Sequence, residues 1–304
     1  MNIKNIAIVG MGALGVMYGD FFTRKLGKDS VTFIADKNRI EKFKTEGVFC
    51  NDRRCEFSVV DEREVGMPAD LLIFAVKATG LAEAIKAVRN KVGDNTIILS
   101  VLNGISSEEL IGQAFGSEKI IHSVVQGMDA TKIGNRVTYT QFGHFFIGVD
   151  DKNKIQKLTA LAELFDKTKL PYTIEDDIIR RMWSKFMLNV GVNQSVMLYE
   201  GTYGTVQAPG DARELMQNAM KEVMVLAEKE NISITQDDFD SYVRLIDTMN
   251  PKGMPSMRQD GLAKRKSEVE LFSGTVVALA KKHNIEVPVN RSIYEKIKKI
   301  ESEY

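Results

Sequence analysis

A lysine and two asparagines recur at intervals of four residues in the second half of the chain. Lys185, Asn189 and Asn193 lie in a stretch, 182–193, that is otherwise mainly apolar. Residues four apart share one face of a helix, so these three form a polar stripe on a helix suited to burial. A cationic donor in line with two amides suits a small, oxygen-rich anionic substrate, and partial burial can lower a lysine pKa enough for Lys185 to act as an acid. The alternative is that the stripe caps or bridges other helices.

A glycine-rich group stands near the start of the chain, between a short apolar run and a helix-forming stretch. It has the form G-x-G-x-x-G and comprises Gly10, Met11, Gly12, Ala13, Leu14 and Gly15. The first glycine permits a tight turn, the second lets backbone approach a pyrophosphate, and the third lets the helix lie close to the strand. The free N–H groups of a helix N-terminus then attract the anion. The pattern predicts a dinucleotide site, and the alternative is a plain glycine-rich turn.

The identity of the cofactor is read at the end of the second predicted strand. Asp36 lies about 20 residues past Gly15, where a carboxylate usually accepts hydrogen bonds from a ribose 2′-OH and repels a 2′-phosphate. This favours NAD. Lys37 and Arg39 follow at once and suit either a 2′-phosphate clamp or a solvated helix start. The stretch therefore leaves NAD and NADP open.

A further polar group lies near the end of the chain. Ser256 follows a Pro/Gly-rich loop, so we expect it to be the N-cap of a helix, and a free helix N-terminus with a hydroxyl also suits a carboxylate. Glu268 and Glu270 point about 200° apart on a helix, so at most one of them faces a given site. By themselves, both glutamates are typical of solvated charges.

Short β-branched runs alternate with helical stretches in the first half of the chain. The predicted strands are Ile3–Val9, Val31–Ile34, Glu56–Val60, Leu71–Val76, Ile97–Val101 and Ile120–Val125. The predicted helices between them are Ala13–Leu26, Asn38–Glu46, Leu81–Lys91 and Ser107–Phe115. Nearly unbroken apolar strands indicate a parallel sheet covered on both faces, so this half is a doubly wound, Rossmann-type α/β domain. Arg136–Gly148 reads as two more strands that form an antiparallel edge.

The second half is predicted to be all-α. A helix over Lys152–Lys169 and a short extended piece around Pro171 precede it, and we expect long helices at 176–199, 211–230, 236–248, 256–283 and 290–302. The predicted domains are residues 1–174, which bind the dinucleotide, and residues 175–304, which carry the substrate and catalytic groups. We expect the cleft between them, at the carboxyl ends of the strands.

Composition excludes several function classes. The chain has 304 residues, long enough for two domains, and 41 Lys and Arg balance 41 Asp and Glu. No overall basic field exists to hold a nucleic acid or an anionic membrane. The histidines carry no metal-binding pattern and the two cysteines no metal spacing, so we expect no metal site. The N-terminus lacks the long apolar run of a signal peptide, and we expect a cytoplasmic protein with reduced cysteines.

Taken together, these residues resemble the ketopantoate reductase (2-dehydropantoate 2-reductase) family over essentially the whole chain. The family has a glycine-rich turn, a lysine after the fourth strand, an Asn-Gly loop after the fifth, the pattern W-x-K-x-x-x-N-x-x-x-N, and S-M-x-Q-D with a glutamate eight residues beyond. The matching positions after the turn are Lys77, Asn103-Gly104, Trp183, Lys185, Asn189, Asn193, Ser256, Asp260 and Glu268.

The resemblance implies reduction of ketopantoate to pantoate by hydride from NADPH, in pantothenate (coenzyme A) biosynthesis. Lys185 would donate the proton to the carbonyl oxygen, and Glu268 would hold Lys185 or support the transfer. Asn103 would lie where nicotinamide and substrate meet. The resemblance further implies that Asn189 and Asn193 bind the substrate's hydroxyl side, that Ser256 takes its carboxylate, and that Lys77 lies beside the cofactor.

Three positions depart from the family pattern, and one of them is Gly80, which stands three residues after Lys77 where the family often has Gln. Asp36 stands where the family often has Arg, which makes NADH possible as well as NADPH, and Gly253 stands where some relatives have a substrate-binding Asn. The alternative function is therefore an NAD-dependent D-2-hydroxyacid dehydrogenase of the D-mandelate type on the same scaffold. A dinucleotide-sensing protein without turnover is the third possibility. The expected partner is a small 2-keto acid, and a homodimer is possible.

Overall fold

The computed structural model describes residues 2–304, and the chain divides into two compact units. The α/β unit comprises the chain up to Leu102 together with Ser106–Ile178. The helical unit comprises Asn103–Ile105 together with Ile179–Tyr304. The short segment Asn103–Ile105 thus belongs with helices that follow it by more than seventy positions, which no local signal in the sequence predicted.

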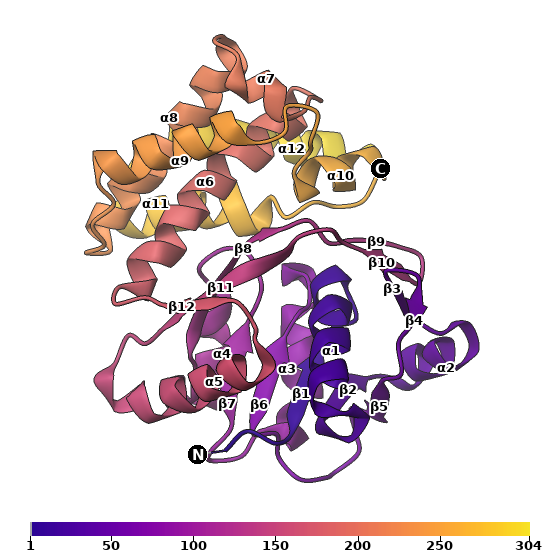
Figure 1. Ribbon diagram of the computed structural model, residues 1–304. Helices are drawn as coiled ribbons and strands as arrows, with labels where there is room; N and C mark the ends of the chain where they lie inside the picture. The colour runs from indigo at the N-terminus through magenta and orange to yellow at the C-terminus, as the bar shows by residue number, and fades with distance from the viewer. Residues whose placement is uncertain (1) are drawn as a thin grey trace. The chain divides into compact units, whose positions relative to one another are not determined.

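A five-stranded parallel sheet forms the centre of the α/β unit (Figure 1). Its strands, in the order β5-β2-β1-β6-β7, are β5 Ser58–Asp61, β2 Val31–Ala35, β1 Ile6–Val9, β6 Leu71–Phe74 and β7 Ile97–Ser100. All residues of β1, β6 and β7 are buried, as their nearly unbroken apolar sequences predict. Since β1 pairs with β2 on one side and β6 on the other, the strand order reverses between β1 and β6. Ligands of doubly wound sheets bind at such a switch point.

Helices cover both faces of this sheet, which confirms the predicted α/β class. They are α1 Ala13–Leu26, α2 Lys37–Glu46, α3 Leu81–Ala87, α4 Ser107–Phe115 and α5 Ile155–Thr168, with one-turn 3₁₀ helices η1 Lys28–Ser30, η2 Ala78–Gly80, η3 Arg89–Lys91, η4 Ser117–Lys119 and η5 Lys152–Lys154. Successive side chains of a strand point to opposite faces. Ile6 and Ile8 therefore join one apolar core with residues of α1 and α5, whereas Ala7 and Val9 join another with residues of α3 and α4.

Two smaller sheets complete the α/β unit. One has the order β4-β3-β10-β9, formed by β4 Arg53–Arg54, β3 Phe49–Cys50, β10 Arg136–Thr138 and β9 Thr131–Ile133. The other has the order β12-β11-β8, formed by β12 Tyr172–Ile174, β11 Phe142–Gly148 and β8 His122–Met128. The prediction of an antiparallel edge over Arg136–Gly148 was wrong. Each of its two strands has an antiparallel partner, β9 or β8, but each also has a parallel partner on its other side, so neither is an edge.

The helical unit is all-α, as predicted. Its helices are α6 Ile178–Leu198, α7 Tyr203–Gln207, α8 Asp211–Lys229, α9 Gln236–Thr248, α10 Ser256–Leu262, the π-helix η6 Glu270–Gly274, α11 Thr275–His283 and α12 Pro288–Glu301. The apolar residues of α6 lie in one core with those of α8, α9, α11 and α12. Gly191 allows α8 to approach α6 closely, because a Cβ there would lie 2.5 Å from Cγ of Met220.

The predicted single helix over 256–283 is broken, which corrects the sequence interpretation. Helix α10 ends at Leu262, and Lys264 adopts a left-handed backbone conformation with φ of 48°. The backbone N–H of Arg265 then donates to the carbonyl of Asp260, and its guanidinium pairs with the Asp260 carboxylate at 2.8 Å. The chain resumes helical structure as η6 and continues directly into α11. The short α7 was also absent from the prediction.

Candidate functional site

The glycine-rich turn lies at the switch point of the parallel sheet. It follows β1, and the neighbouring loop after β6 touches it at Ala75. A Cβ on Gly10, whose φ is +104°, would lie 2.5 Å from the Ala75 carbonyl oxygen. A Cβ on Gly15 would lie 2.0 Å from the Gly10 carbonyl oxygen. These two glycines are therefore required by the close approach of backbone to backbone, as the motif predicts.

Gly12 differs from the other two glycines because its surroundings are open. The nearest atom to a Cβ there would be the Ala75 oxygen at 3.6 Å. Gly12 is the N-cap residue of α1, and no side chain caps this end or places a carboxylate in the first turn. The first N–H groups of α1, from Ala13 onward, thus meet no acceptor side chain. An uncapped helix N-terminus behind a turn with room for backbone approach fits the pyrophosphate of a dinucleotide.

Asp36 lies at the end of β2, where it is the N-cap of α2. Its Oδ1 accepts a hydrogen bond from the Arg39 backbone N–H at 2.9 Å, and its Oδ2 lies 3.4 Å from Nε of Arg39. The Asp36 side chain keeps 38% of its surface exposed. Lys37 is exposed on the first turn of α2, where its charge helps to lower the pKa of Asp61, whose main partner is Arg63. The Asp36 carboxylate is thus accessible. The two adjacent cations already have carboxylates near them, Asp61 for Lys37 and Asp36 itself for Arg39.

Lys77 stands in the loop after β6, next to the turn. The Ala75 backbone N–H donates to the Val9 carbonyl at 2.9 Å, which holds this loop beside β1, and Lys77 follows two residues later as the N-cap of η2. Its side chain is exposed. The structure thus brings Lys77 to the same end of the sheet as the glycine-rich turn.

One contact at the turn was not predicted. The Lys132 ammonium, from β9, donates a hydrogen bond to the carbonyl oxygen of Met11. The two residues are 121 positions apart, and the hairpin that carries Lys132 has no motif that could have indicated its place.

In the helical unit, the predicted lysine and the Asn-Gly loop come together. The Lys185 Nζ donates to Oδ1 of Asn103 at 3.1 Å, and Nδ2 of Asn103 donates to Oε2 of Glu268 at 3.3 Å. Asn103 therefore links the lysine to the glutamate through the two ends of its amide. Lys185, Asn103 and Glu268 are all half-buried, so the group is neither sealed in the core nor fully solvated.

Asn189 and Asn193 continue the polar stripe along α6. Their exposed fractions are 9% and 6%. Within the part of the chain that the structure describes, Nδ2 of Asn189 is buried and has no hydrogen-bond partner. A buried amide donor without an acceptor costs about 1–3 kcal/mol, so this nitrogen keeps the capacity to donate to a polar ligand. At Asn189, therefore, the alternative that the polar stripe caps or bridges neighbouring helices does not account for the Nδ2 donor.

The backbone around Asn103 is fixed by the residue that follows it. Gly104 has a φ of +90°, and a Cβ there would lie 2.8 Å from Cγ of Leu271 in the π-helix η6. The loop can therefore approach η6 only because residue 104 is glycine. A second network fixes η6 itself, because its Ser273 N–H donates to Gln194 of α6 at 3.2 Å and its Ser273 hydroxyl donates to Asn290 of α12 at 2.9 Å.

Ser256 does not have the predicted role in its helix. Pro255 occupies the N-cap position of α10, no side chain caps it, and Ser256 is the first helical residue and is exposed. The expectation of a serine N-cap was wrong because the loop ends one residue earlier, at a proline whose fixed φ already suits the helix start. Across residues 2–304, no hydrogen bond joins Ser256 to Lys185.

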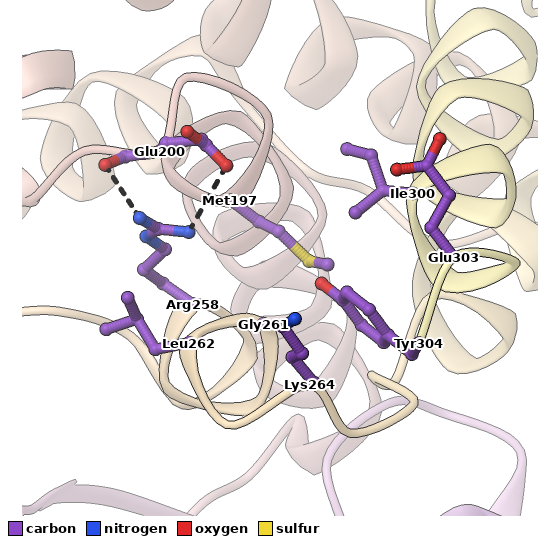
Figure 2. A pocket seen from close by; sticks show the side chains of 9 residues that line it. All are labelled: Met197, Glu200, Arg258, Gly261, Leu262, Lys264, Ile300, Glu303 and Tyr304. Carbon is purple, nitrogen blue, oxygen red and sulfur yellow. Dashed lines mark hydrogen bonds and ion pairs between the residues drawn. The ribbon is translucent and has the colours of Figure 1, made fainter.

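A cavity of about 290 Å³ lies elsewhere in the helical unit. Figure 2 shows the side chains around it: Met197, Glu200, Arg258, Gly261, Leu262, Lys264, Ile300, Glu303 and Tyr304. Arg258 spans one side, donating to the Glu200 carbonyl oxygen at 3.0 Å. None of the predicted site residues lines this cavity.

The described residues hold no cluster of three or more histidine, cysteine, aspartate or glutamate side chains arranged for a metal ion. Within the same residues, no helix combines the length and the apolar character needed to cross a membrane.

Comparison with known proteins covers nearly the whole chain. Residues 6–152 match the family model "Ketopantoate reductase PanE/ApbA", and residues 177–301 match "Ketopantoate reductase PanE/ApbA C terminal". A 2-dehydropantoate 2-reductase of Aquifex aeolicus (strain VF5) is 28% identical over 303 residues, which cover 97% of this chain and 96% of the relative.

Two solved structures share the fold. D-mandelate dehydrogenase in a ternary structure with NADH and anilino(oxo)acetate has a TM-score of 0.89 at 20% identity, over 98% of this chain and 99% of the other. A dimeric ketopantoate reductase from Staphylococcus aureus has a TM-score of 0.80 at 20% identity, over the same shares of the two chains. At these identities the structures establish a common fold. With both family models matched, this chain belongs to the ketopantoate reductase family of oxidoreductases.

Proposed function

We propose that the chain is a 2-dehydropantoate 2-reductase, which reduces the keto group of ketopantoate to the hydroxyl of pantoate in pantothenate biosynthesis. The observation that carries the proposal is the linked group of Lys185, Asn103 and Glu268 in the helical unit. The Aquifex aeolicus relative supports the choice of substrate. We expect a cytoplasmic enzyme.

The reaction needs a nicotinamide dinucleotide, which would be held by the turn Gly10–Gly15 and by Asp36, Lys37 and Lys77. When bound, the reduced nicotinamide supplies a hydride to the keto carbon. The residues of this chain would do the rest. Lys185 would donate a proton to the oxygen that becomes the hydroxyl, and as a cation it would stabilise the charge that develops there. Glu268, through Asn103, would hold the lysine in place.

The remaining residues would bind the substrate. Nδ2 of Asn189, with Asn193 on the same face, would donate a hydrogen bond to the hydroxyl side of ketopantoate. Ser256, exposed on the first turn of α10, would take the carboxylate. Asn103 would lie where nicotinamide and substrate meet.

The cofactor in this proposal is NADPH, as the family resemblance implies, with NADH as the alternative. Asp36 favours the alternative, because its accessible carboxylate repels a 2′-phosphate and its partner Arg39 is already paired with it. The same residue supports the second candidate function, an NAD-dependent D-2-hydroxyacid dehydrogenase, as does the similarity in fold to D-mandelate dehydrogenase with NADH. A dinucleotide sensor without turnover is the third candidate.

One assay separates the three candidates. The purified chain is mixed with ketopantoate and either NADPH or NADH, and the nicotinamide absorbance is followed. The proposal expects oxidation with ketopantoate. Oxidation only with other 2-keto acids would favour the dehydrogenase, and dinucleotide binding without oxidation of any 2-keto acid would favour the sensor. Light scattering of the same preparation tests whether the chain forms a homodimer.

A further inference from the structure

The contact between Lys132 and Met11 joins a small sheet to the glycine-rich turn within the α/β unit. Met11 lies between Gly10 and Gly12, and its carbonyl oxygen accepts the hydrogen bond from the ammonium. A lysine ammonium has three donors, so one bond to a backbone oxygen leaves two for another acceptor.

The backbone around Lys132 is fixed by a hairpin. Lys132 pairs with Val137 of β10, which is fully buried, and the turn of the hairpin contains Gly134 with a φ of +60°. Nδ2 of Asn135 in the same turn donates to the Glu46 carbonyl at the end of α2, at 2.9 Å. This bond ties the hairpin to α2, so the backbone from which the Lys132 side chain extends to the glycine-rich turn is held in place.

The charge of Lys132 is not balanced by the protein. Across residues 2–304, no carboxylate forms an ion pair with it, although the side chain is half-buried. Burial lowers the pKa of Lys132, and the positive charge of nearby Lys42 lowers it further. Lys42 itself pairs with Glu46 at 3.9 Å, so Lys132 is the cation of the two that has no carboxylate partner among the described residues. A half-buried charge is costly unless it is paired, so this arrangement suits an anion that arrives from outside.

We propose that Lys132 binds the pyrophosphate of the dinucleotide, as a cofactor-binding residue in addition to the helix N-terminus of α1. The inference rests on the proposed dinucleotide site. The Lys132 ammonium lies on the carbonyl oxygen of Met11, within the glycine-rich turn. The next residue of the turn, Gly12, is open to the close approach of a ligand. A lysine serves phosphates as a compact point charge.

The test is a titration of NADH and NADPH against the wild-type chain, Lys132→Met and Lys132→Gln, following nicotinamide fluorescence. Lys132→Gln retains an amide donor for the Met11 oxygen but has no charge, so it separates a phosphate role from a structural one. Arg136→Met is the matched control, because it also removes one positive charge from this hairpin. The Arg136 charge is paired with Asp52 instead of lying at the glycine-rich turn.

We expect Kd for both cofactors to rise about 10- to 100-fold in Lys132→Met and in Lys132→Gln, and to change less than about twofold in Arg136→Met. The salt dependence of Kd should also become weaker in the two Lys132 variants, since one charge pair is lost. Thermal unfolding of each variant checks that the fold is retained.

Two results would overturn the inference. One is an unchanged Kd in the folded Lys132→Gln variant. The other is a loss confined to NADPH, which would place the ammonium on the 2′-phosphate. If the wild-type chain binds neither dinucleotide, the proposed function itself fails, and this inference fails with it. The two results above instead presuppose that the wild-type chain binds a dinucleotide, so a failure of this inference alone can be told apart.

Discussion

The amide of Asn103 lies between Lys185 and Glu268, accepting a hydrogen bond from the lysine and donating one to the glutamate. The three residues come from a loop after β7, from α6 and from the segment before η6. Through this bond the amide gives the lysine ammonium an uncharged acceptor that orients it. This is the arrangement expected of a proton donor that must point in one direction.

The first prediction concerns Lys185. Lys185→Met should lower kcat about 10²–10³-fold, because the variant lacks both the proton and the charge that stabilises the developing alkoxide. Dinucleotide affinity and thermal stability should stay near the wild-type values. Steady-state kinetics and a cofactor titration check this, and a near-normal kcat would remove Lys185 from the mechanism.

The second prediction concerns the glycine after Asn103. Gly104→Ala places a Cβ 2.8 Å from Cγ of Leu271 at a φ of +90°. We expect a loss of about 2–4 kcal/mol in unfolding free energy, from backbone strain and overpacking together, and a fall in kcat of about 10²-fold as Asn103 moves.

The matched control for that variant is Gly27→Ala. Gly27 has a similar φ, +94°, but a Cβ there meets no atom within 4 Å. It should lose only about 1–2 kcal/mol and keep its kcat. Equal losses of stability and activity in the two variants, measured by denaturant unfolding and kinetics, would contradict the role assigned to Leu271.

The third prediction separates two glycines of the cofactor turn. Gly12→Ala should fold as the wild type does, because its Cβ meets nothing closer than 3.6 Å, yet its Kd for dinucleotide should rise about 10²-fold or more, since the methyl group lies where the pyrophosphate approaches. Gly15→Ala should instead destabilise the α/β unit, because its Cβ lies 2.0 Å from a backbone oxygen. Melting curves and fluorescence titrations distinguish the two outcomes, and tight binding by Gly12→Ala would count against the site.

The fourth prediction concerns cofactor choice. Asp36→Asn keeps an oxygen acceptor for the Arg39 N–H that caps α2 but removes the negative charge. The ratio of NADPH affinity to NADH affinity should rise about tenfold or more, because the repulsion of a 2′-phosphate is relieved. Titration of both cofactors against both chains measures the ratio. An unchanged ratio would show that Asp36 does not face the ribose.

The fifth prediction is a pH dependence of stability. Oε1 of Glu230 accepts hydrogen bonds from Lys282 at 2.6 Å and from His283 at 2.5 Å, and these partners lower the pKa of Glu230 below its ordinary 4.5. A carboxylate with a lowered pKa in the folded state contributes stability above its ordinary pKa and loses it as the pH falls through the folded value.

Glu230→Gln should therefore be about 1 kcal/mol less stable than the wild type at pH 7, and the difference should shrink as the pH falls below 4.5. Glu228→Gln, at an exposed neighbour with no ion pair among the described residues, should match the wild type over the same pH range. Denaturant unfolding over this range makes the comparison. A difference that persists at low pH would assign the effect to packing.

The sequence by itself determined the elements whose signals are local. The bounds of α1 and α4 were predicted to the residue, because each begins and ends where the helical periodicity does. The motif also predicted the roles of Gly10 and Gly15, because only a residue without a Cβ fits where two backbone segments approach so closely. The stripe of Lys185, Asn189 and Asn193 on one face of α6 follows from the helical period alone.

Only the tertiary structure decided which distant residues meet. Nothing near Asn103 in the sequence indicates that it joins the helical unit, because that depends on Gly104 fitting against Leu271. The break between α10 and η6 depends on the pairing of Arg265 with Asp260, and the approach of Lys132 to Met11 depends on how a hairpin is tied to α2. Such contacts are fixed by the packing of whole elements, and their energies exist only once the chain has folded.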